Sequence, residues 1–248
     1  SRNRPVVFLV PRTVSLHANP GKALDQYEPV FRQHVEECLK QIPSLLNIDL
    51  RTLLYPTEND DHLKKRQSDF NGVENEDVND TGQQSEKPGV THAATFILEY
   101  ALAKLLIEWG ISPDAMIGEG VGKYVADCLS GKISREDALA LAVGYKQSRK
   151  KVSHDSVSGI EEFLKKPEQV LLEVGFHQSM SKQVLEHPEK SKQQVILTSL
   201  QRVGEYAPER ASLLKSLGTL WLAGVNIDWN GVHAHTRRNR LPLPTYPF

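Results

Sequence analysis

The sequence predicts an α/β fold in which a short, mainly parallel β-sheet carries helices on both faces. Short apolar runs of strand-forming residues alternate along the chain with longer segments whose apolar residues have helical spacing. The runs expected as strands are Val6–Val10, Ala115–Gly118, Val170–Val174 and Val195–Leu197. Because such strands are joined through helical crossovers, we expect them to pair in parallel.

The helical segments follow from the same spacing argument. Thr91–Trp109 has apolar residues on one stripe and stops at Gly110, which predicts an amphipathic helix. Leu24–Leu39 shows a comparable stripe, and Ser134 is a suitable N-cap for a helix that follows it. Further helices are expected at Val121–Ser130, Arg135–Gln147 and Pro208–Ala223, with a helical turn at Leu50–Leu54.

The organisation of the chain follows from a change in composition between residues 57 and 90. Acidic and amide residues dominate there, and such a stretch cannot bury enough apolar surface to offset its conformational entropy. We expect a mobile polar loop at 57–90, with a partner-binding loop as the alternative. It would separate two parts of one core, residues 1–56 and 91–230. Residues 231–248 form a tail that is interrupted by prolines.

Composition excludes several classes of function. The 248 residues carry a formal net charge of −1, so no overall field favours nucleic acid or an anionic membrane. The longest apolar runs are short of the roughly 20 residues that a membrane span requires. Cys38 and Cys128 both fall in expected helices, and buried free thiols of a reducing compartment are the expectation. We therefore expect a cytoplasmic protein.

The most informative motif joins the second expected strand to the next helix. A strand, a Gly-rich turn and a helix make up the nucleophile elbow, Gly-x-Ser-x-Gly. In this chain the elbow reads Gly118-Glu119-Gly120-Val121-Gly122. Glycine has no side chain to acylate, so the turn is expected without its nucleophile.

Stretches on both sides of this turn share one resemblance. They are Leu98–Ala103, Trp109-Gly110, Pro113–Ala115, Ile117-Gly118, Gly122 and Asp137–Leu139, together with Phe31–Tyr55, Leu171–Gly175 and Leu241–Phe248. In this order they closely resemble the acyltransferase domains of polyketide synthases. The resemblance implies an acyltransferase scaffold.

Within the resemblance, the residues that carry the chemistry differ. The family's elbow reads Gly-His-Ser-x-Gly-Glu, and here Glu119 replaces His, Gly120 replaces Ser and Lys123 replaces Glu. Glu119 and Lys123 have the spacing of neighbours that can pair. The family also places an arginine that pairs with malonyl or methylmalonyl carboxylates. Counted from Gly120, its position is Tyr145, so that arginine is expected to be lost.

Two further parts of the family's pattern are altered. After the first strand the family has Pro-Gly-Gln-Gly-Ser-Gln, whose first Gln helps to form the oxyanion hole. Here the loop begins Pro11-Arg12-Thr13, with Thr13 at the place of that Gln. Further along the chain the family has a ferredoxin-like small subdomain, which brings the catalytic histidine. In that interval this chain has only Lys150–Gln169. We expect that subdomain to be missing.

No other group is a strong candidate for catalysis or metal binding. His92 replaces a family Gln, and a capping or packing role beside Thr91 is the simpler interpretation. Ser153–Asp155 contains the residue types of a triad, but three consecutive residues cannot aim at one point. His233 and His235 lack cysteine or acidic neighbours for zinc. We expect no catalytic residue, cofactor or metal.

These observations favour a non-catalytic acyltransferase-like domain of a modular polyketide synthase. Its expected role is that of a scaffold, or of a docking or adaptor element for ketosynthase or loading-module domains, a carrier protein or a trans-acting acyltransferase. The tail 231–248 would lead towards a neighbouring ketosynthase. The alternative is a remodelled acyltransferase or hydrolase with a displaced nucleophile such as Ser15 or Ser130. We expect the face around Glu119, Lys123 and Tyr145 to be covered by Lys150–Gln169 or to contact a partner.

Overall fold

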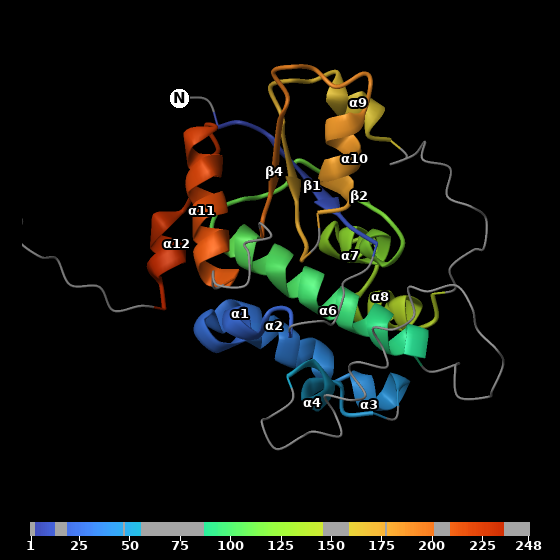
Figure 1. The fold of residues 1–248 in the computed structure, drawn as a ribbon. Coiled ribbons are helices and arrows are strands. Elements are labelled where there is room, and N and C mark those ends of the chain that lie inside the picture. Colours follow the sequence, from blue (N-terminus) through green and yellow to red (C-terminus); the bar gives the residue numbers. More distant parts are fainter. Residues whose placement is uncertain are drawn as a thin grey trace, which may run out of the picture.

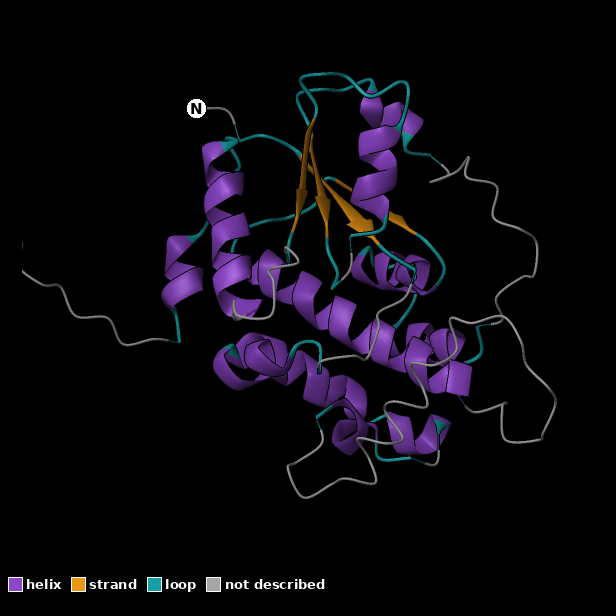
Figure 2. Ribbon diagram, in the orientation of Figure 1, coloured by secondary structure: helices purple, strands orange, loops and turns teal. Residues whose placement is uncertain are grey.

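The computed structural model describes residues 3–12, 19–46, 48–55, 87–145, 159–176, 178–200 and 209–235. Within these residues the strands form one four-stranded parallel sheet in the order β2-β1-β3-β4 (Figures 1 and 2). The strands are β1 (Val6–Val10), β2 (Ala115–Gly118), β3 (Val170–Glu173) and β4 (Val195–Thr198). The predicted fold class and the four predicted strands are confirmed.

The position of each strand in the sheet explains how deeply it is buried. β1 pairs with β2 on one side and with β3 on the other, and every residue of β1 and β3 is buried. β2 and β4 lie at the two edges, and their residues are only partly buried. They are less buried because an edge strand has a neighbour on one side only.

Helices cover both faces of the sheet. Successive side chains of a strand point to opposite faces, and accordingly Phe8 packs in a large core while Val7 packs in a smaller one. The helices with the larger core are α1 (Lys22–Tyr27), α2 (Pro29–Leu39), α3 (Ile42–Leu45), α4 (Leu50–Leu54), α6 (Lys87–Glu108), α7 (Val121–Leu129), α8 (Arg135–Val143), α11 (Glu209–Leu222) and α12 (Trp229–His233). The helices that pack in the smaller core are α9 (Glu161–Leu164) and α10 (Met180–Glu186).

Helix α6 is the centre of the larger core. It runs between the sheet and the pair α1 and α2 (Figure 1). It begins at Lys87, four residues before the expected Thr91, and it is buried on nearly all sides rather than amphipathic. Its length and composition would allow it to cross a membrane, but 83% of its most apolar window is buried inside the fold. This burial is that of a core helix.

The expected single helix Leu24–Leu39 is in fact two helices. Glu28 separates α1 from α2 and has an extended backbone, with φ −116° and ψ 98°. A residue that precedes proline is kept out of the helical region, and Pro29 then begins α2. The carboxylate of Glu28 accepts a hydrogen bond of 2.6 Å from Arg210 Nε, so the bend is tied to α11.

Several expectations concern residues outside the described ranges. These are Thr13 and Ser15, most of the polar loop 57–90, the triad-like Ser153–Asp155, and the tail from residue 236. Of the connection Lys150–Gln169, the structure describes residues 159–169, which include α9. Every strand of the described residues belongs to the one parallel sheet.

Candidate functional site

The Gly-rich turn after β2 has the sharp geometry that its sequence predicts. β2 ends at Gly118 and α7 begins at Val121. Between them Gly120 has φ 52° and ψ −119°, a backbone conformation that residues with side chains rarely adopt. The turn is fixed to the central strand because the N–H of Glu119 donates a hydrogen bond of 3.0 Å to the carbonyl of Val10. The frame of a nucleophile elbow is therefore present.

Two of its glycines are required by close packing of the backbone. A Cβ atom on Gly118 would lie 2.3 Å from the carbonyl oxygen of Gly122. A Cβ atom on Gly122 would lie 2.3 Å from the carbonyl oxygen of Val10. Neither distance is possible, so these two positions accept only glycine whether or not the turn carries a nucleophile.

The third glycine lies beneath an arginine side chain. A Cβ atom on Gly120 would lie 2.5 Å from Cγ and 3.3 Å from Cβ of Arg12. Arg12 comes from the loop that follows β1, the loop expected as a degenerate oxyanion loop. A side chain at position 120 would thus enter space that Arg12 already fills. The place from which a nucleophile would act is occupied.

The charges beside the turn differ from the expected arrangement. Glu119 is partly buried, and burial raises the pKa of its carboxyl group, with Glu173 acting in the same direction and Arg12 lowering it. Lys123 is exposed and is not among the groups that shift this pKa. The cation that acts on the pKa of Glu119 is therefore Arg12, and among the described residues no ion pair joins Glu119 to Lys123.

A buried carboxylate anchors the helix next to this site. Glu173, at the end of β3, is fully buried. Its Oε1 accepts hydrogen bonds from the N–H groups of Ser179 (2.9 Å) and Met180 (3.0 Å), and its Oε2 accepts one from the N–H of Ser181 (2.8 Å). These donors are the free N–H groups at the start of α10, where a negative charge is favoured. Both carboxyl oxygens of Glu173 therefore have hydrogen-bond donors.

A second buried carboxyl group has no such partners. Glu99 of α6 is fully buried, and within the part of the chain that the structure describes neither of its carboxyl oxygens has a hydrogen-bond partner. A Cβ atom on Gly175 would lie 3.3 Å from Oε1 of Glu99 and 2.6 Å from Cγ of Pro11, which places Glu99 near the loop that covers the turn. Burial, and then the charge of Glu173, raise the pKa of Glu99 well above its usual value. Burial without a charge partner therefore favours the protonated form of Glu99.

Aromatic rings surround the position of the expected lost arginine. The rings of Tyr145 and His92 are 5.1 Å apart and those of Tyr145 and Tyr124 are 6.2 Å apart, both edge to face. His92 is buried in α6, and burial lowers the pKa of its imidazole. Because α6 starts before Thr91, that residue is inside the helix and is not its N-cap. His92 has a packing role here.

Solved structures share this architecture over most of their length. The acyltransferase domain of ZmaA matches with a TM-score of 0.76 and 17% identity, over 98% of this chain and 80% of that domain. The acyltransferase domain from the second module of the salinomycin polyketide synthase matches with a TM-score of 0.64 and 16% identity, over 99% of this chain and 80% of that domain. The fold is that of a polyketide synthase acyltransferase domain.

Sequence relatives of the chain are polyketide synthases and acyltransferase homologues. A phenolphthiocerol/phthiocerol polyketide synthase of Mycobacterium tuberculosis is 29% identical over 154 residues, which are 62% of this chain and 8% of that protein. The polyketide biosynthesis acyltransferase homolog BaeD of Bacillus velezensis is 31% identical over 137 residues, which are 55% of this chain and 36% of that protein. The chain thus spans only a small part of these relatives. No family model matches it.

Sequence reasoning missed the two buried acids of the acyltransferase fold. Glu99 and Glu173 were noted only as parts of stretches that resemble the family. A signal was present for Glu99, because it stands among the apolar residues of a helix that is buried on nearly all sides. The placement of Arg12 over Gly120 had no such signal, since a contact between residues so far apart in the chain has no local pattern.

The other candidates are not brought to the turn. Ser130 follows α7, and its hydroxyl donates a hydrogen bond of 3.1 Å to the carbonyl of Asp127. His233 lies in α12 and His235 just beyond it, both exposed. Within the described part of the chain, no three His, Cys, Asp or Glu side chains are placed to hold a metal ion. Cys38 and Cys128 are free thiols.

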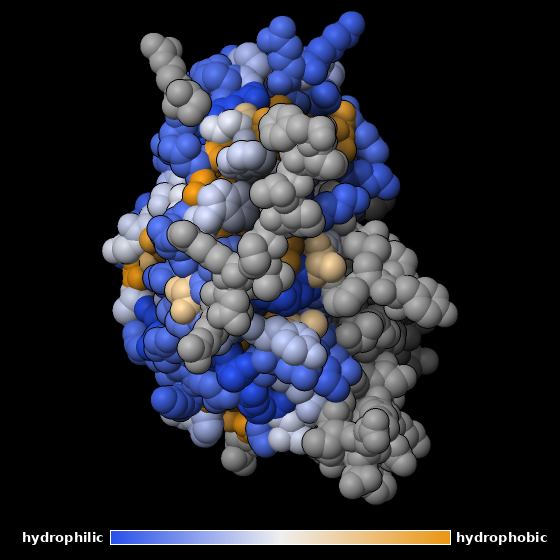
Figure 3. Space-filling view, turned by 90° about the vertical axis from the view of Figure 1, so that its left-hand side faces the viewer, coloured by the Kyte–Doolittle hydropathy of each residue, from blue (hydrophilic) through white to orange (hydrophobic). Residues whose placement is uncertain are grey.

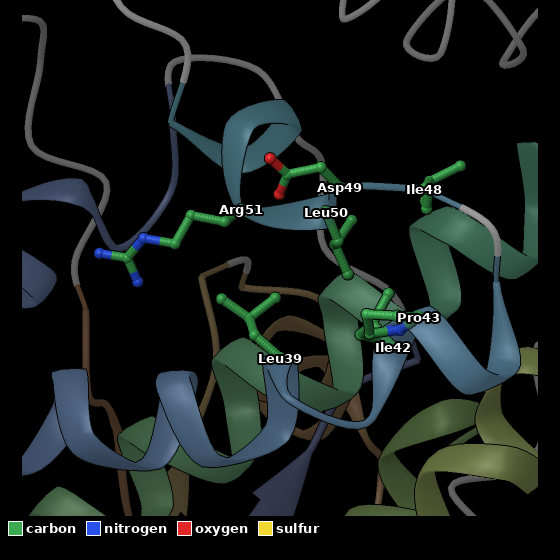
Figure 4. A pocket seen from close by; sticks show the side chains of 7 residues that line it. All are labelled: Leu39, Ile42, Pro43, Ile48, Asp49, Leu50 and Arg51. Carbon is green, nitrogen blue, oxygen red and sulfur yellow. The ribbon is translucent and has the colours of Figure 1, made fainter.

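A surface pocket of about 310 Å³ lies elsewhere, between α2, α3 and α4 (Figure 4). Asp49 uses its carboxylate to cap α4, and Arg51 forms ion pairs with Asp25 (2.9 Å) and Glu36 (2.6 Å). The polar groups at its rim are therefore engaged with the protein itself, and no residue of the elbow lines the pocket. Its lining is Leu39, Ile42, Pro43, Ile48, Asp49, Leu50 and Arg51.

Proposed function

We propose that this chain is a non-catalytic acyltransferase-like domain that serves a modular polyketide synthase as a scaffold or docking element. The observation that carries the proposal is the pair formed by Gly120 and Arg12. Gly120 holds the turn of a nucleophile elbow without a nucleophile, and Arg12 fills the space above it. The elbow is then a structural connection between β2 and α7.

The chemistry of acyl transfer supports this proposal. The reaction needs a nucleophile, a base that takes its proton, and donors aimed at the developing oxyanion. Removing one oxyanion donor lowers the rate by a factor of about 10²–10³, and the residues of a triad act as a unit. Here the nucleophile is missing, Arg12 occupies its place, and aromatic rings surround the position expected for the carboxylate-binding arginine. These changes together remove the means for catalysis.

The test is self-acylation measured by intact mass. The protein is incubated with malonyl-, methylmalonyl- or acetyl-coenzyme A beside an active acyltransferase domain as positive control. We expect no adduct. We also expect none for Gly120→Ser or for Gly120→Ser combined with Arg12→Gly, because a base is still required.

An adduct on the unmodified chain would overturn the proposal. If it disappeared with Ser15→Ala or Ser130→Ala, the chain would be a remodelled acyltransferase or hydrolase with a displaced nucleophile. If it disappeared with neither change, peptide mapping of the adduct would locate the reactive group.

The proposed partners are other parts of a synthase. The relatives include long synthases of which this chain matches only a part, which makes adjacent synthase domains plausible neighbours. Ketosynthase or loading-module domains, a carrier protein and a trans-acting acyltransferase are the candidates. The proposal places the protein in the cytoplasm, without cofactor or metal.

The contact surface is proposed around the former active site, at Glu119, Lys123 and Tyr145. A pull-down of the protein with each candidate partner tests it. Charge reversal by Glu119→Lys or Lys123→Glu should weaken one of these contacts. Lys215→Glu is the matched control, because Lys215 is exposed on α11, which packs against α1 and the opposite edge strand β4. If both reversals leave every contact unchanged, the docking surface lies elsewhere.

The proposed organisation is one core, residues 1–56 and 91–230, with an excursion at 57–90 and a tail at 231–248. Limited proteolysis tests it. We expect first cleavage within 57–90, with the two core fragments remaining associated. Resistance of that segment to protease would contradict the proposal.

A further inference from the structure

Two buried acids meet at the carboxyl end of β3. Glu173 is the last residue of the strand, and Leu171 packs in the smaller core, so alternation directs the side chain of Glu173 to that face of the sheet. Glu99 comes from α6 on the other face, and a Cβ atom on Gly175 would lie 3.3 Å from its Oε1. Gly175 is only two residues beyond Glu173. The two carboxyl groups therefore approach one short stretch of backbone from opposite faces of the sheet.

The two acids differ in what surrounds them. The carboxyl group of Glu173 accepts hydrogen bonds from three N–H groups at the start of α10, whereas within the described residues neither oxygen of Glu99 has a donor. Glu173 is the one charged group of these residues that shifts the pKa of Glu99, and it carries the same sign. Glu173 also acts on Glu119 of the elbow, where Arg12 is the opposing cation. In the described part of the chain, no cation acts on Glu99 itself.

Helix α10 relies on Glu173 because it has little support of its own. It has seven residues, and a helix of this length is not stable without tertiary contacts. Its N-cap residue, Ser179, makes no side-chain hydrogen bond to the free N–H groups of the first turn. Among the residues of the helix only Met180, Ser181 and Val184 are buried. Loss of the bonds to Glu173 would therefore free the start of the helix.

A negative charge on Glu99 would weaken this attachment. It would place a second charge beside Glu173 in a region of low dielectric, and a buried charge without donors is costly. If the start of α10 moves away, water reaches the end of β3, where it hydrates the carboxylates and reduces their repulsion. A proton on Glu99 removes this cost. Protonation of Glu99 therefore favours the form in which α10 is attached.

We propose that Glu99 and Glu173 form a pH-sensitive latch for α10. While Glu99 is protonated, Glu173 holds the start of the helix. When Glu99 releases its proton to water, the helix separates from the end of β3 and uncovers the part of the smaller core that lies beneath Met180 and Val184. The inference does not depend on the proposed function, since it assigns neither acid to acyl transfer or to the proposed contact surface.

Opening of α10 would create a kind of surface that is absent from the face of the closed molecule shown in Figure 3. On that face, hydrophobic residues form small separate groups among hydrophilic ones. In the smaller core, by contrast, Val7, Leu9 and Leu171 are fully buried on the paired strands β1 and β3. The latch would therefore control access to a continuous apolar surface.

The test is amide hydrogen exchange of the full chain between pH 5 and pH 8, with each measured rate divided by the rate of an unstructured chain at the same pH. The closed form keeps a proton that the open form releases, so opening should increase with pH above 4.5, the usual pKa of the group, until the closed-form pKa is reached. The increase is at most about tenfold per pH unit. We expect the protection of Ser179, Met180 and Ser181 to fall by more than about tenfold over this range.

Variants at position 99 show whether this change comes from the latch. Glu99→Gln should keep the protection of α10 constant to within about twofold, because the side chain no longer titrates. Glu99→Leu is a second variant, which avoids a buried amide. Glu108→Gln is the matched control, because Glu108 is an exposed acid on the same helix, and it should keep the pH dependence of the unmodified protein. The amides of β1 are the reference for unfolding of the whole chain.

Three results would overturn the proposal. If the protection of α10 has the same pH dependence with and without the carboxyl group at position 99, Glu99 does not act on the helix. If the amides of α10 and β1 have the same protection at every pH, the helix opens only when the whole protein unfolds. If the ¹³C-labelled carboxyl group of Glu99 titrates near 4.5 in the folded protein, the closed form does not retain the proton.

Discussion

The side chain of Arg12 packs over the α-carbon of Gly120, and its Cγ would lie 2.5 Å from a Cβ atom there. Arg12 belongs to the loop after β1 and Gly120 to the turn after β2, so the contact joins the ends of two paired strands. The backbone of Gly120 keeps the positive φ of the turn. Substitutions of Gly120 and Arg12, alone and together, therefore separate the effect of the clash on stability from the effect of the backbone strain.

Gly120→Ala should lower the free energy of unfolding by about 2 kcal/mol, since it combines a strained φ with a clash against Arg12. Arg12→Ala alone should have a small effect. The double variant should recover the part due to the clash but not the part due to φ. Urea unfolding of the four proteins measures the coupling free energy. A coupling of zero would mean that the two residues do not touch.

Gly122→Ala should be far more damaging than an alanine at another glycine. Its Cβ would lie 2.3 Å from the carbonyl of Val10, and backbone cannot move away as a flexible side chain can. We expect a loss of at least about 3 kcal/mol or failure to fold. Gly144→Ala is the matched control, because φ there is −81° and the nearest atom would be 3.5 Å away. The control should be neutral or slightly stabilising. Equal effects of the two substitutions would refute the close packing of the turn.

Glu99 should make the protein less stable as pH rises. Its usual pKa is 4.5, and burial raises that value well above this in the folded state. Below pH 4.5 the group is protonated in both states and contributes no pH dependence. As pH rises above 4.5 the unfolded chain releases the proton while the folded protein retains it, so stability falls until the folded-state pKa is reached.

Glu99→Gln should flatten this decline. The measurement is the free energy of unfolding from pH 4 to pH 8, compared between the variant and the unmodified protein. Glu99→Leu is a second variant that removes the titration without adding an amide. If both variants keep the original slope, Glu99 is ionised in the folded protein and the assignment is wrong.

Glu173→Ala should release the start of α10. Three N–H groups would lose their acceptor, and leaving buried donors unsatisfied costs on the order of 3 kcal/mol. Hydrogen exchange at Ser179, Met180 and Ser181 should accelerate more than at β1. Glu173→Gln retains an acceptor but not the charge and should give an intermediate effect. Unchanged exchange in α10 for Glu173→Ala would show that the helix does not rely on this carboxylate.

The sequence was sufficient for the elements that have long or uninterrupted patterns. Val6–Val10 is uniformly apolar and forms the central strand β1, and the turn at Gly118–Gly122 has the predicted geometry. Ser134 caps α8 as expected by accepting a hydrogen bond from the N–H of Asp137. In each of these cases the interactions that decide the structure are local or depend only on burial.

Other features depended on contacts that a linear pattern does not contain. The short helices α3, α9, α10 and α12 have four to seven residues each, too few for a periodic signal. Arg12 and Gly120 lie in two separate loops that come into contact only in the folded protein. Glu99 is buried because other elements pack around α6. The bend at Glu28 was predictable, because Pro29 restricts the residue before it.

The packing of Gly118 and Gly122 has a consequence for how such turns are recognised in other sequences. Both glycines are required by backbone approach alone, and that requirement is the same whether position 120 bears a hydroxyl or nothing. Glycine spacing therefore indicates only that the chain makes this tight turn. A search based on the spacing alone would retrieve domains with and without a hydroxyl at the middle position. The residue at the middle position, together with the residue that lies over it, carries the information that the glycine spacing does not.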